Sequence, residues 1–211
     1  MQALEKLITG FKQFKQRYYV EEPELYEELL RQGQSPEVLV IACCDSRVHP
    51  AQVMNTDPGD IFVVRNVANL VPLYEEDGKS HGTSAALEFG VKHLKVKHII
   101  VFGHANCGGV RSLMEGGVGS ENGGFIDPWM RTATPARDKI LESYSDLSFE
   151  QQCHLCEQFV IAISIQNLLT FPWIKSRVEA GDLTIHGWYF DLKIGKLLEL
   201  NPTDDSFSII M

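Results

Sequence analysis

Residues 37–47 read Glu-Val-Leu-Val-Ile-Ala-Cys-Cys-Asp-Ser-Arg, and this stretch decides the fold that we expect for the chain. The apolar run 38–42 follows Ser35-Pro36 and is typical of a strand buried on both faces, as in a parallel sheet. Two thiols, a carboxylate and a guanidinium group come directly after it. Binding sites in parallel sheets form at the carboxyl ends of the strands. The stretch therefore predicts a strand and a functional site together.

Other apolar runs repeat this pattern of strand and helix along the chain. The strands predicted after the first are 60–66 and 98–103, and the second of these runs into His104-Ala105-Asn106-Cys107. Helical spacing is found at 83–94, about 127–144 and 149–170, and a hairpin at 184–191 and 196–200 turns at Ile194-Gly195. Strands that alternate with helices favour an α/β fold: a largely parallel central sheet flanked by helices, with a C-terminal hairpin.

The N-terminal segment predicts a helical arm. Its apolar residues recur at helical spacing: Leu4, Leu7, Ile8, Phe11, Phe14 and Tyr18. We expect one domain over residues 1–211, in which residues 1–30 form this arm and pack on their own domain or on a partner subunit. Because lysines flank the apolar residues, a helix lying on a membrane surface is the alternative.

Composition limits the classes of partner. The 211 residues are 44% hydrophobic and 22% charged, and the net charge is -9. No basic face is predicted, so we expect no nucleic-acid partner. No apolar run reaches the roughly 18 residues of a membrane span, and no signal peptide is evident, so we expect no membrane partner. Five cysteines, two of them adjacent, argue against a disulfide framework and favour a reducing cytoplasm.

The thiols and the histidine at the strand ends predict a metal centre. Alternate residues of a strand share a face, so only one of Cys43 and Cys44 can easily join it, and the pair Asp45 and Arg47 favours Cys43. His104 and Cys107 lie three residues apart and can reach the same ion. Cysteine and histidine suit Zn²⁺, and three protein ligands with one open position are the pattern of a catalytic zinc.

The two motifs resemble those of the β-class carbonic anhydrases. Cys-x-Asp-x-Arg at 43–47 is followed about sixty residues later by His-x-x-Cys-Gly-Gly at 104–109. The likeness extends to the segments 59–69, 82–83 and 167–172, and it covers roughly residues 25–200. Gln34, nine residues before the first ligand, is similar to the plant-type members. Val40 stands where another variant of the family has tryptophan, so that variant's inhibitory bicarbonate site is not expected.

The resemblance implies a function and a set of residues. It implies one Zn²⁺ per chain, bound by Cys43, His104 and Cys107, and reversible hydration of CO₂ to bicarbonate and a proton. Asp45 and Arg47 would form a dyad, and Asp45 would become a fourth ligand if Arg47 released it. The implied substrate pocket consists of Gln34, Phe62 and Val67, and Phe89 stands where plant-type members have tyrosine. The chain is expected to self-associate as a dimer or a higher even oligomer.

Several alternatives stay open. The same zinc site could hydrolyse CS₂ or carbonyl sulfide. A zinc-stabilised interaction protein is disfavoured because a structural site has no use for Asp45 and Arg47. A zinc alcohol dehydrogenase would need a glycine-rich dinucleotide loop, which the sequence lacks. His49 and His81 are expected to be ordinary surface or packing residues, Cys153 and Cys156 to be buried in a helix, and 115–124, with five glycines, to be a loop.

Overall fold

A computed structural model describes residues 2–116 and 124–211. The chain divides into two compact units, Met1–Ser35 and Pro36–Met211. The predicted loop at 115–124 falls mostly on 117–123, outside the described residues. Among those residues, no single helix is long and apolar enough to cross a bilayer. Only a pair of helices, Phe149–Leu168 and Pro172–Glu179, reaches the length and composition together, and these two are bent by 91°.

The smaller unit contains the helix expected from the apolar spacing at its N-terminus and a second helix, which lies largely within the residues predicted to form a helical arm. Helix α1 (Gln2–Gln16) continues as a π-helical turn at Arg17–Glu21, and α2 (Pro23–Gln32) begins at a proline, whose fixed φ suits the first turn of a helix. The ring of Tyr26 lies 5.7 Å from that of Phe14 and 5.8 Å from that of Tyr18, so aromatic contacts hold the two helices together.

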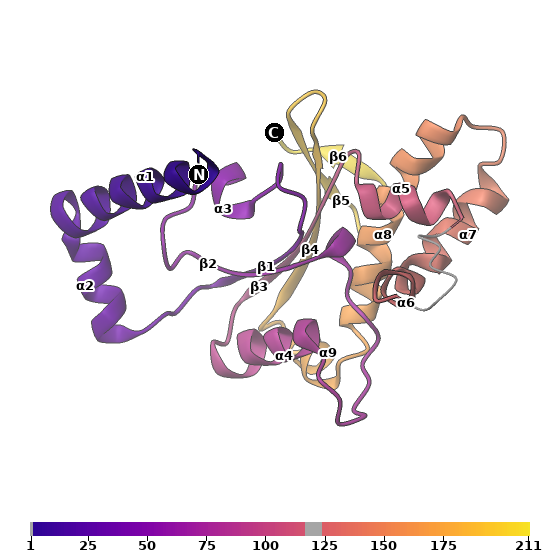
Figure 1. Cartoon of the computed structure of the whole chain (residues 1–211). Coiled ribbons are helices and arrows are strands. Elements are labelled where there is room, and N and C mark those ends of the chain that lie inside the picture. Colours follow the sequence, from indigo (N-terminus) through magenta and orange to yellow (C-terminus); the bar gives the residue numbers. More distant parts are fainter. Residues whose placement is uncertain (1, 117–123) are drawn as a thin grey trace. The chain divides into compact units, whose positions relative to one another are not determined.

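The larger unit is built on the sheet that the sequence predicts. The strands are β1 (Val38–Cys43), β2 (Ile61–Asn66), β3 (His98–His104), β4 (Thr184–Asp191), β5 (Lys196–Leu200) and β6 (Phe207–Ile209), in the order β2-β1-β3-β4-β5-β6 (Figure 1). The first four run parallel, and β5 and β6 are added antiparallel. The parallel sheet and the C-terminal hairpin are therefore confirmed, and β6 is an addition to the prediction.

Helices connect the strands. They are α3 (Pro50–Val53), α4 (Gly82–Glu88), α5 (Gly108–Met114), α6 (Ile126–Met130), α7 (Thr134–Ser143), α8 (Phe149–Leu168) and α9 (Pro172–Glu179). A π-helical turn at Phe89–His93 extends α4. The predicted helix at 127–144 is instead α6 and α7, separated by a 3₁₀ turn; Pro135 lies in the first turn of α7, where a missing N–H costs nothing. Pro172, expected only to end a helix, begins α9.

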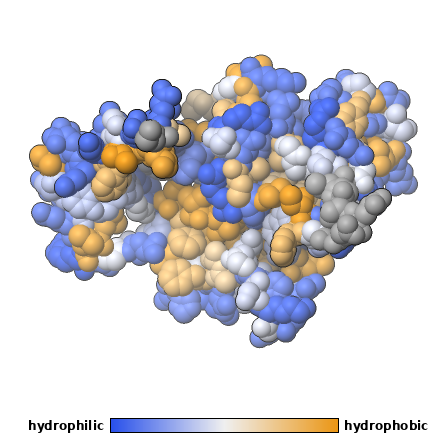
Figure 2. Space-filling model, in the orientation of Figure 1, coloured by the Kyte–Doolittle hydropathy of each residue, from blue (hydrophilic) through white to orange (hydrophobic). Residues whose placement is uncertain are grey.

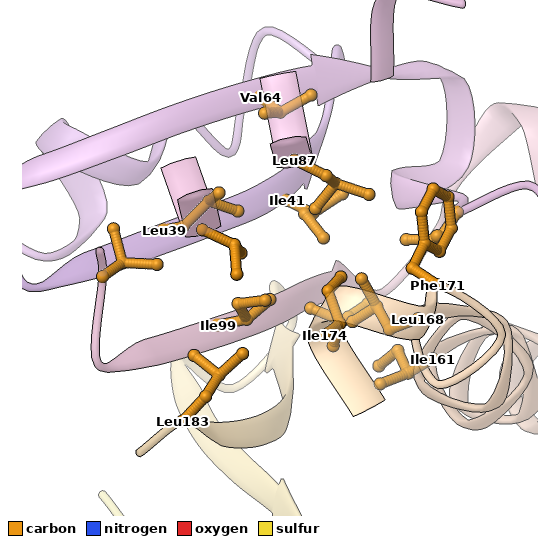
Figure 3. Packing of buried hydrophobic residues seen from close by; sticks show 14 of the residues in the cluster. Leu39, Ile41, Val64, Leu87, Ile99, Ile161, Leu168, Phe171, Ile174 and Leu183 are labelled. Carbon is orange, nitrogen blue, oxygen red and sulfur yellow. The ribbon is translucent and has the colours of Figure 1, made fainter. Parts of the chain in front are cut away.

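The main core lies between one face of the sheet and α4, α8 and α9 (Figure 3). Leu39 and Ile41 of β1 meet Leu87 of α4 and Ile161 of α8 in this core. Two glycines let α8 lie directly against the strands. A Cβ atom added to Gly103 of β3 would be 2.7 Å from Ile161 Cδ1, and one added to Gly187 of β4 would be 2.9 Å from Ile161 Cγ2.

The same parallel arrangement positions the two motifs. β1 ends at Cys43 and β3 ends at His104, and the two strands are neighbours. Because parallel strands end at the same edge of a sheet, the residues that follow them meet there. The side chains after β1 and β3 therefore converge at one edge, where α5 begins and α8 passes.

Candidate metal centre

Three buried side chains meet at this edge of the sheet. The ligating atoms of Cys43, His104 and Cys107 all lie within 4.8 Å of one another, and the two Sγ atoms are 4.0 Å apart. The exposed fractions of the three residues are 5%, 1% and 2%. Cys44 is exposed, so the structure brings Cys43, and not its neighbour, into the cluster.

The backbone after β3 turns so that His104 and Cys107 face one point. The N–H of Ala105 still bonds to the carbonyl of Phe190, which extends the pairing with β4. Asn106 then takes a left-handed conformation with φ of 57°, which asparagine tolerates better than most residues. Cys107 follows as the cap of α5. The turn therefore returns Cys107 to the side of the sheet edge where His104 ends.

His104 has the geometry of a metal ligand. Its Nδ1 lies 2.9 Å from the carbonyl oxygen of Ala105. A carbonyl only accepts, so Nδ1 carries the hydrogen and Nε2 has a free lone pair. Nε2 is buried and has no hydrogen-bond partner among the described residues. A buried polar atom without a partner costs free energy, and a metal ion between this nitrogen and the two thiols would satisfy it. The three residues therefore fit a zinc ion.

The two thiols differ in acidity because they face each other. A hydrogen bond from Cys107 lowers the pKa of Cys43, although burial acts in the opposite direction. The same contact, together with burial, raises the pKa of Cys107. One of the two thiols is thus prepared to be a thiolate, which is the form that binds metal.

Asp45 is held by Arg47 beside the cluster. Arg47 donates through Nε to Asp45 Oδ1 at 2.9 Å and through Nη2 to Oδ2 at 2.6 Å, and its backbone N–H also bonds to Oδ1 at 2.9 Å. These bonds hold the pKa of Asp45 well below its usual range. Arg47 Nη2 further reaches the carbonyl of Asn106 at 2.9 Å. Because both carboxylate oxygens accept from Arg47, Asp45 is kept ionised and available as an acceptor.

The three predicted pocket residues belong to different parts of the structure, and Val67 is described first. Val67 directly follows β2 and packs against the apolar cluster that includes Cys43 and Cys107. A Cβ atom on Gly109, two residues after Cys107, would meet Val67 Cγ1 at 2.9 Å. Trp129 Nε1 donates to the carbonyl of Val67 at 2.8 Å and fixes this segment. Val67 therefore forms an apolar wall next to two of the candidate metal ligands.

Phe62 does not reach the metal ligands of its own chain. It pairs with Leu39, whereas Asn66 pairs with Cys43, so Phe62 lies four residues or roughly 13 Å back along the strand. Its ring stands 6.0 Å from that of Phe89, which is 44% exposed, and Figure 2 shows apolar side chains gathered around α4 in this region. Gln34 belongs to the smaller unit, so its place in a pocket stays a prediction.

The remaining residues named from the sequence are two histidines and the two cysteines of α8. His81 Nε2 pairs with Asp77 at 2.7 Å, and half-buried His49 precedes α3. Cys153 and Cys156 are buried in α8, as predicted, and burial raises their pKa to about 11 and about 12. They are therefore neutral thiols.

Sequence reasoning missed the residues that support the ligands through backbone atoms. Arg65 donates through Nε to the carbonyl of Cys43 at 2.9 Å and through Nη2 to that of Asp45 at 2.8 Å. Glu157 accepts from the backbone N–H of Cys107 at 2.9 Å. The available signal for Glu157 was its position on the buried side of α8, together with Cys153, Cys156 and Val160.

Comparisons with known proteins point to one family. Residues 38–197 match the family model described as carbonic anhydrase. The chain is 39% identical over 197 residues to β carbonic anhydrase 3 of Arabidopsis thaliana, which covers 92% of this chain and 76% of that protein. The solved structure of the β-carbonic anhydrase CcaA superposes with a TM-score of 0.92 at 31% identity and covers 100% of this chain and 93% of that one. A tetrameric β-carbonic anhydrase of Sordaria macrospora gives a TM-score of 0.83 at 28% identity, with coverages of 95% and 98%.

Proposed function

This chain belongs to the β-class carbonic anhydrase family and is an enzyme, and from that premise we propose that it hydrates CO₂ reversibly to bicarbonate and a proton at a zinc ion. One observation supports the zinc site above all. A ring nitrogen of His104 lies within 4.8 Å of the thiols of Cys43 and Cys107, and its buried Nε2 has no hydrogen-bond partner among the described residues. Structural zinc sites usually have four protein ligands, so three ligands leave room for a reactant.

The metal would supply the nucleophile. Zn²⁺ held by Cys43, His104 and Cys107 would lower the pKa of a water molecule to about 7, so that a nucleophile exists at neutral pH. Because the two thiolates donate charge, this centre is expected to be a weaker Lewis acid than one built from histidines alone. Orientation by the protein therefore carries more of the catalysis.

Asp45 and Arg47 provide that orientation. Asp45 is acceptor-only when ionised, and Arg47 occupies a lone pair on each of its oxygens. A remaining lone pair can accept a hydrogen from the attacking water and direct the oxygen of that water toward CO₂. Arg47 is tied to the carbonyl of Asn106 as well, so the dyad is fixed to the turn that carries the ligands. If Arg47 let go, Asp45 would be free to close the site as a fourth ligand.

We also propose that a second copy of the chain completes the substrate pocket. Val67 packs beside the cluster of its own chain, whereas Phe62 lies four residues further back along β2. A partner copy could supply Phe62 and Gln34 across an interface. Self-association as a dimer or a higher even oligomer agrees with the tetrameric Sordaria macrospora enzyme.

The proposal also covers the substrate and the cellular compartment. CO₂ and bicarbonate are the substrates, and the proteins compared above are carbonic anhydrases, so CS₂ or carbonyl sulfide hydrolysis and a zinc-stabilised interaction protein gain no support. The five cysteines are free thiols, which supports a reducing compartment such as the cytoplasm.

The test combines metal analysis with substrate comparison. The purified full chain is expected to contain about one zinc per chain and to hydrate CO₂, with turnover lost on chelation and restored by zinc. Carbonyl sulfide and CS₂ are assayed with the same preparation. If zinc-loaded protein turned over carbonyl sulfide or CS₂ but not CO₂, the proposed substrate would be wrong.

A further inference from the structure

A buried carboxylate, which the proposed mechanism does not use, lies behind the metal ligands. Glu157 of α8 is 5% exposed. Its Oε1 accepts the backbone N–H of Cys107 at 2.9 Å, and its Oε2 accepts the hydroxyl of Tyr189 at 2.7 Å. Both oxygens are therefore occupied by donors. Burying a carboxyl group is costly unless it is hydrogen-bonded, so these two bonds explain how Glu157 is tolerated there.

Tyr189 connects Glu157 to a second residue of α8. It lies on β4, is fully buried, and also brings its hydroxyl within 3.0 Å of His154 Nδ1. His154 stands one turn before Glu157 on α8 and lines a cavity of about 450 Å³. That cavity reaches Ala105 and Asn106, which lie between the two ligands of the turn. Glu157 thus bonds to the turn at Cys107, and Arg47 bonds to it at Asn106.

We propose that Glu157 is a positioning residue of the zinc centre and that Tyr189 holds it in place. The inference rests on the zinc site proposed above and adds residues outside the ligand set. Groups that hydrogen-bond to the ligands or to their backbone orient them, and their loss typically weakens metal binding about 10- to 100-fold. Glu157 fixes the amide of Cys107, and so the direction of its Sγ.

A purely structural role would give a different signature. Glu157 joins α8, β4 and the turn before α5, so its loss could reduce stability and leave the metal unaffected. Stability of the metal-free protein and affinity for zinc are therefore measured separately. The absorption of the Co²⁺-substituted protein adds a third measurement, because its thiolate bands report the geometry of the sulfur ligands and not the stability of the fold.

The variants keep the shape of each side chain and change its hydrogen bonds. Glu157→Gln has one acceptor oxygen instead of two, so it cannot accept from both the Cys107 N–H and the Tyr189 hydroxyl. Tyr189→Phe keeps the ring and removes only the hydroxyl. Glu150→Gln is the matched control, since Glu150 lies on the same helix and the same cavity but is exposed and pairs with Arg111 at 2.8 Å.

Zinc affinity is measured on full-length protein by competition with a chelator. We expect Glu157→Gln to weaken zinc binding about 10- to 100-fold and to shift the Co²⁺–thiolate bands. Tyr189→Phe is expected to weaken it about threefold to tenfold, and Glu150→Gln to leave it unchanged. If Glu157→Gln fails to fold, the decision rests on Tyr189→Phe, whose unchanged affinity would overturn the proposal.

The result that overturns the inference differs from the one that overturns the function. Folded Glu157→Gln with wild-type zinc affinity and unchanged Co²⁺ bands would show that Glu157 does not position the centre. Wild-type protein that binds zinc but fails to hydrate CO₂ would instead overturn the proposed function and leave the affinity comparison valid. Wild-type protein without zinc affinity would overturn both.

Discussion

In the proposed mechanism, Arg47 determines whether Asp45 can serve as an acceptor at the metal centre. The guanidinium group occupies both carboxylate oxygens and a backbone carbonyl of the ligand turn. Paired, planar hydrogen bonds of this kind are among the strongest that a side chain makes. In this mechanism, Arg47 alone therefore sets whether Asp45 stays paired with the guanidinium group or is released to bind the metal.

Removing Arg47 should let Asp45 bind the metal. Arg47→Gln cannot form the bidentate pair, so we expect CO₂ hydration to fall about 10- to 100-fold while zinc is retained. The absorption of the Co²⁺-substituted variant should change as a carboxylate joins the ligands. Arg137→Gln, which breaks an exposed pair with Asp138, is the control. Wild-type turnover in Arg47→Gln would show that Asp45 needs no such partner.

The cluster of Cys43, His104 and Cys107, which we propose as the metal site, could be predicted because its chemistry is visible in the sequence. Cysteine, histidine and the Asp-Arg pair each follow a predicted strand, and strand alternation separated Cys43 from Cys44. Arg65 and Glu157 could not be found in the same way, because they bond to backbone atoms of the ligands. Any residue type offers those atoms, so no motif marks the partner.

The close packing of α8 on the sheet depends on glycine in the strands that it covers. Gly103→Ala would bring a methyl group to 2.7 Å from Ile161 Cδ1. We expect a loss of about 1–3 kcal/mol in the free energy of unfolding, measured by chemical denaturation. Gly10→Ala is the control. Gly10 lies within α1 with nothing within 4 Å of the added methyl, so a gain of about 0.5–1 kcal/mol is expected. Equal stability of Gly103→Ala and wild type would mean that α8 can move away from β3.

Helix α8 should also make the fold sensitive to alkaline pH. Burial raises the pKa of Cys153 to about 11 and that of Cys156 to about 12, from about 9 in the unfolded chain. Above pH 9 the unfolded state loses these protons first, so stability falls as pH rises toward 11. The double variant Cys153→Ala/Cys156→Ala should lose less stability than wild type between pH 9 and 10.5, by roughly 3 kcal/mol for the two thiols together. Cys44→Ala, at an exposed position, should behave like wild type, and parallel pH curves for all three would refute the assignment.

At the level of elements, periodicity predicted the strands and long helices but not their interruptions. β1, β2 and β3 are short apolar runs, which local patterns identify well. The separation of α6 from α7, and the start of α9 at Pro172, depend on prolines that end one helix or begin the next, and a pattern alone does not say which. β6 has only three residues, Phe207–Ile209, and exists because it pairs with β5.

At the scale of the whole molecule, the sequence names pocket residues without saying which chain supplies them. Phe62 lies on the same strand as Asn66, the neighbour of Cys43, but about four residues away. For this reason we propose that a pocket containing both Val67 and Phe62 is completed by a second copy. This conclusion needs strand register, which the motifs do not contain.

A mixed oligomer tests that conclusion. Asp45→Asn and Phe62→Ala chains are expected to be weakly active alone. A hybrid dimer of the two has one site with both residues intact and one with both defects, so we expect about half the wild-type rate per dimer. The two chains are co-expressed with different tags and the hybrid is purified by both. Activity of the hybrid equal to the mean of the two parents would mean that each chain supplies its own Phe62.

The most direct test of the account is the rate of CO₂ hydration per bound zinc, measured by stopped flow against pH for wild type and Asp45→Asn. The account predicts about one zinc per chain in both proteins and rapid hydration in wild type that rises with pH. It predicts a fall of about 100-fold or more in Asp45→Asn, because the acceptor is lost while the ligands remain. Zinc-loaded wild type without hydration, or Asp45→Asn with the full wild-type rate, would contradict it.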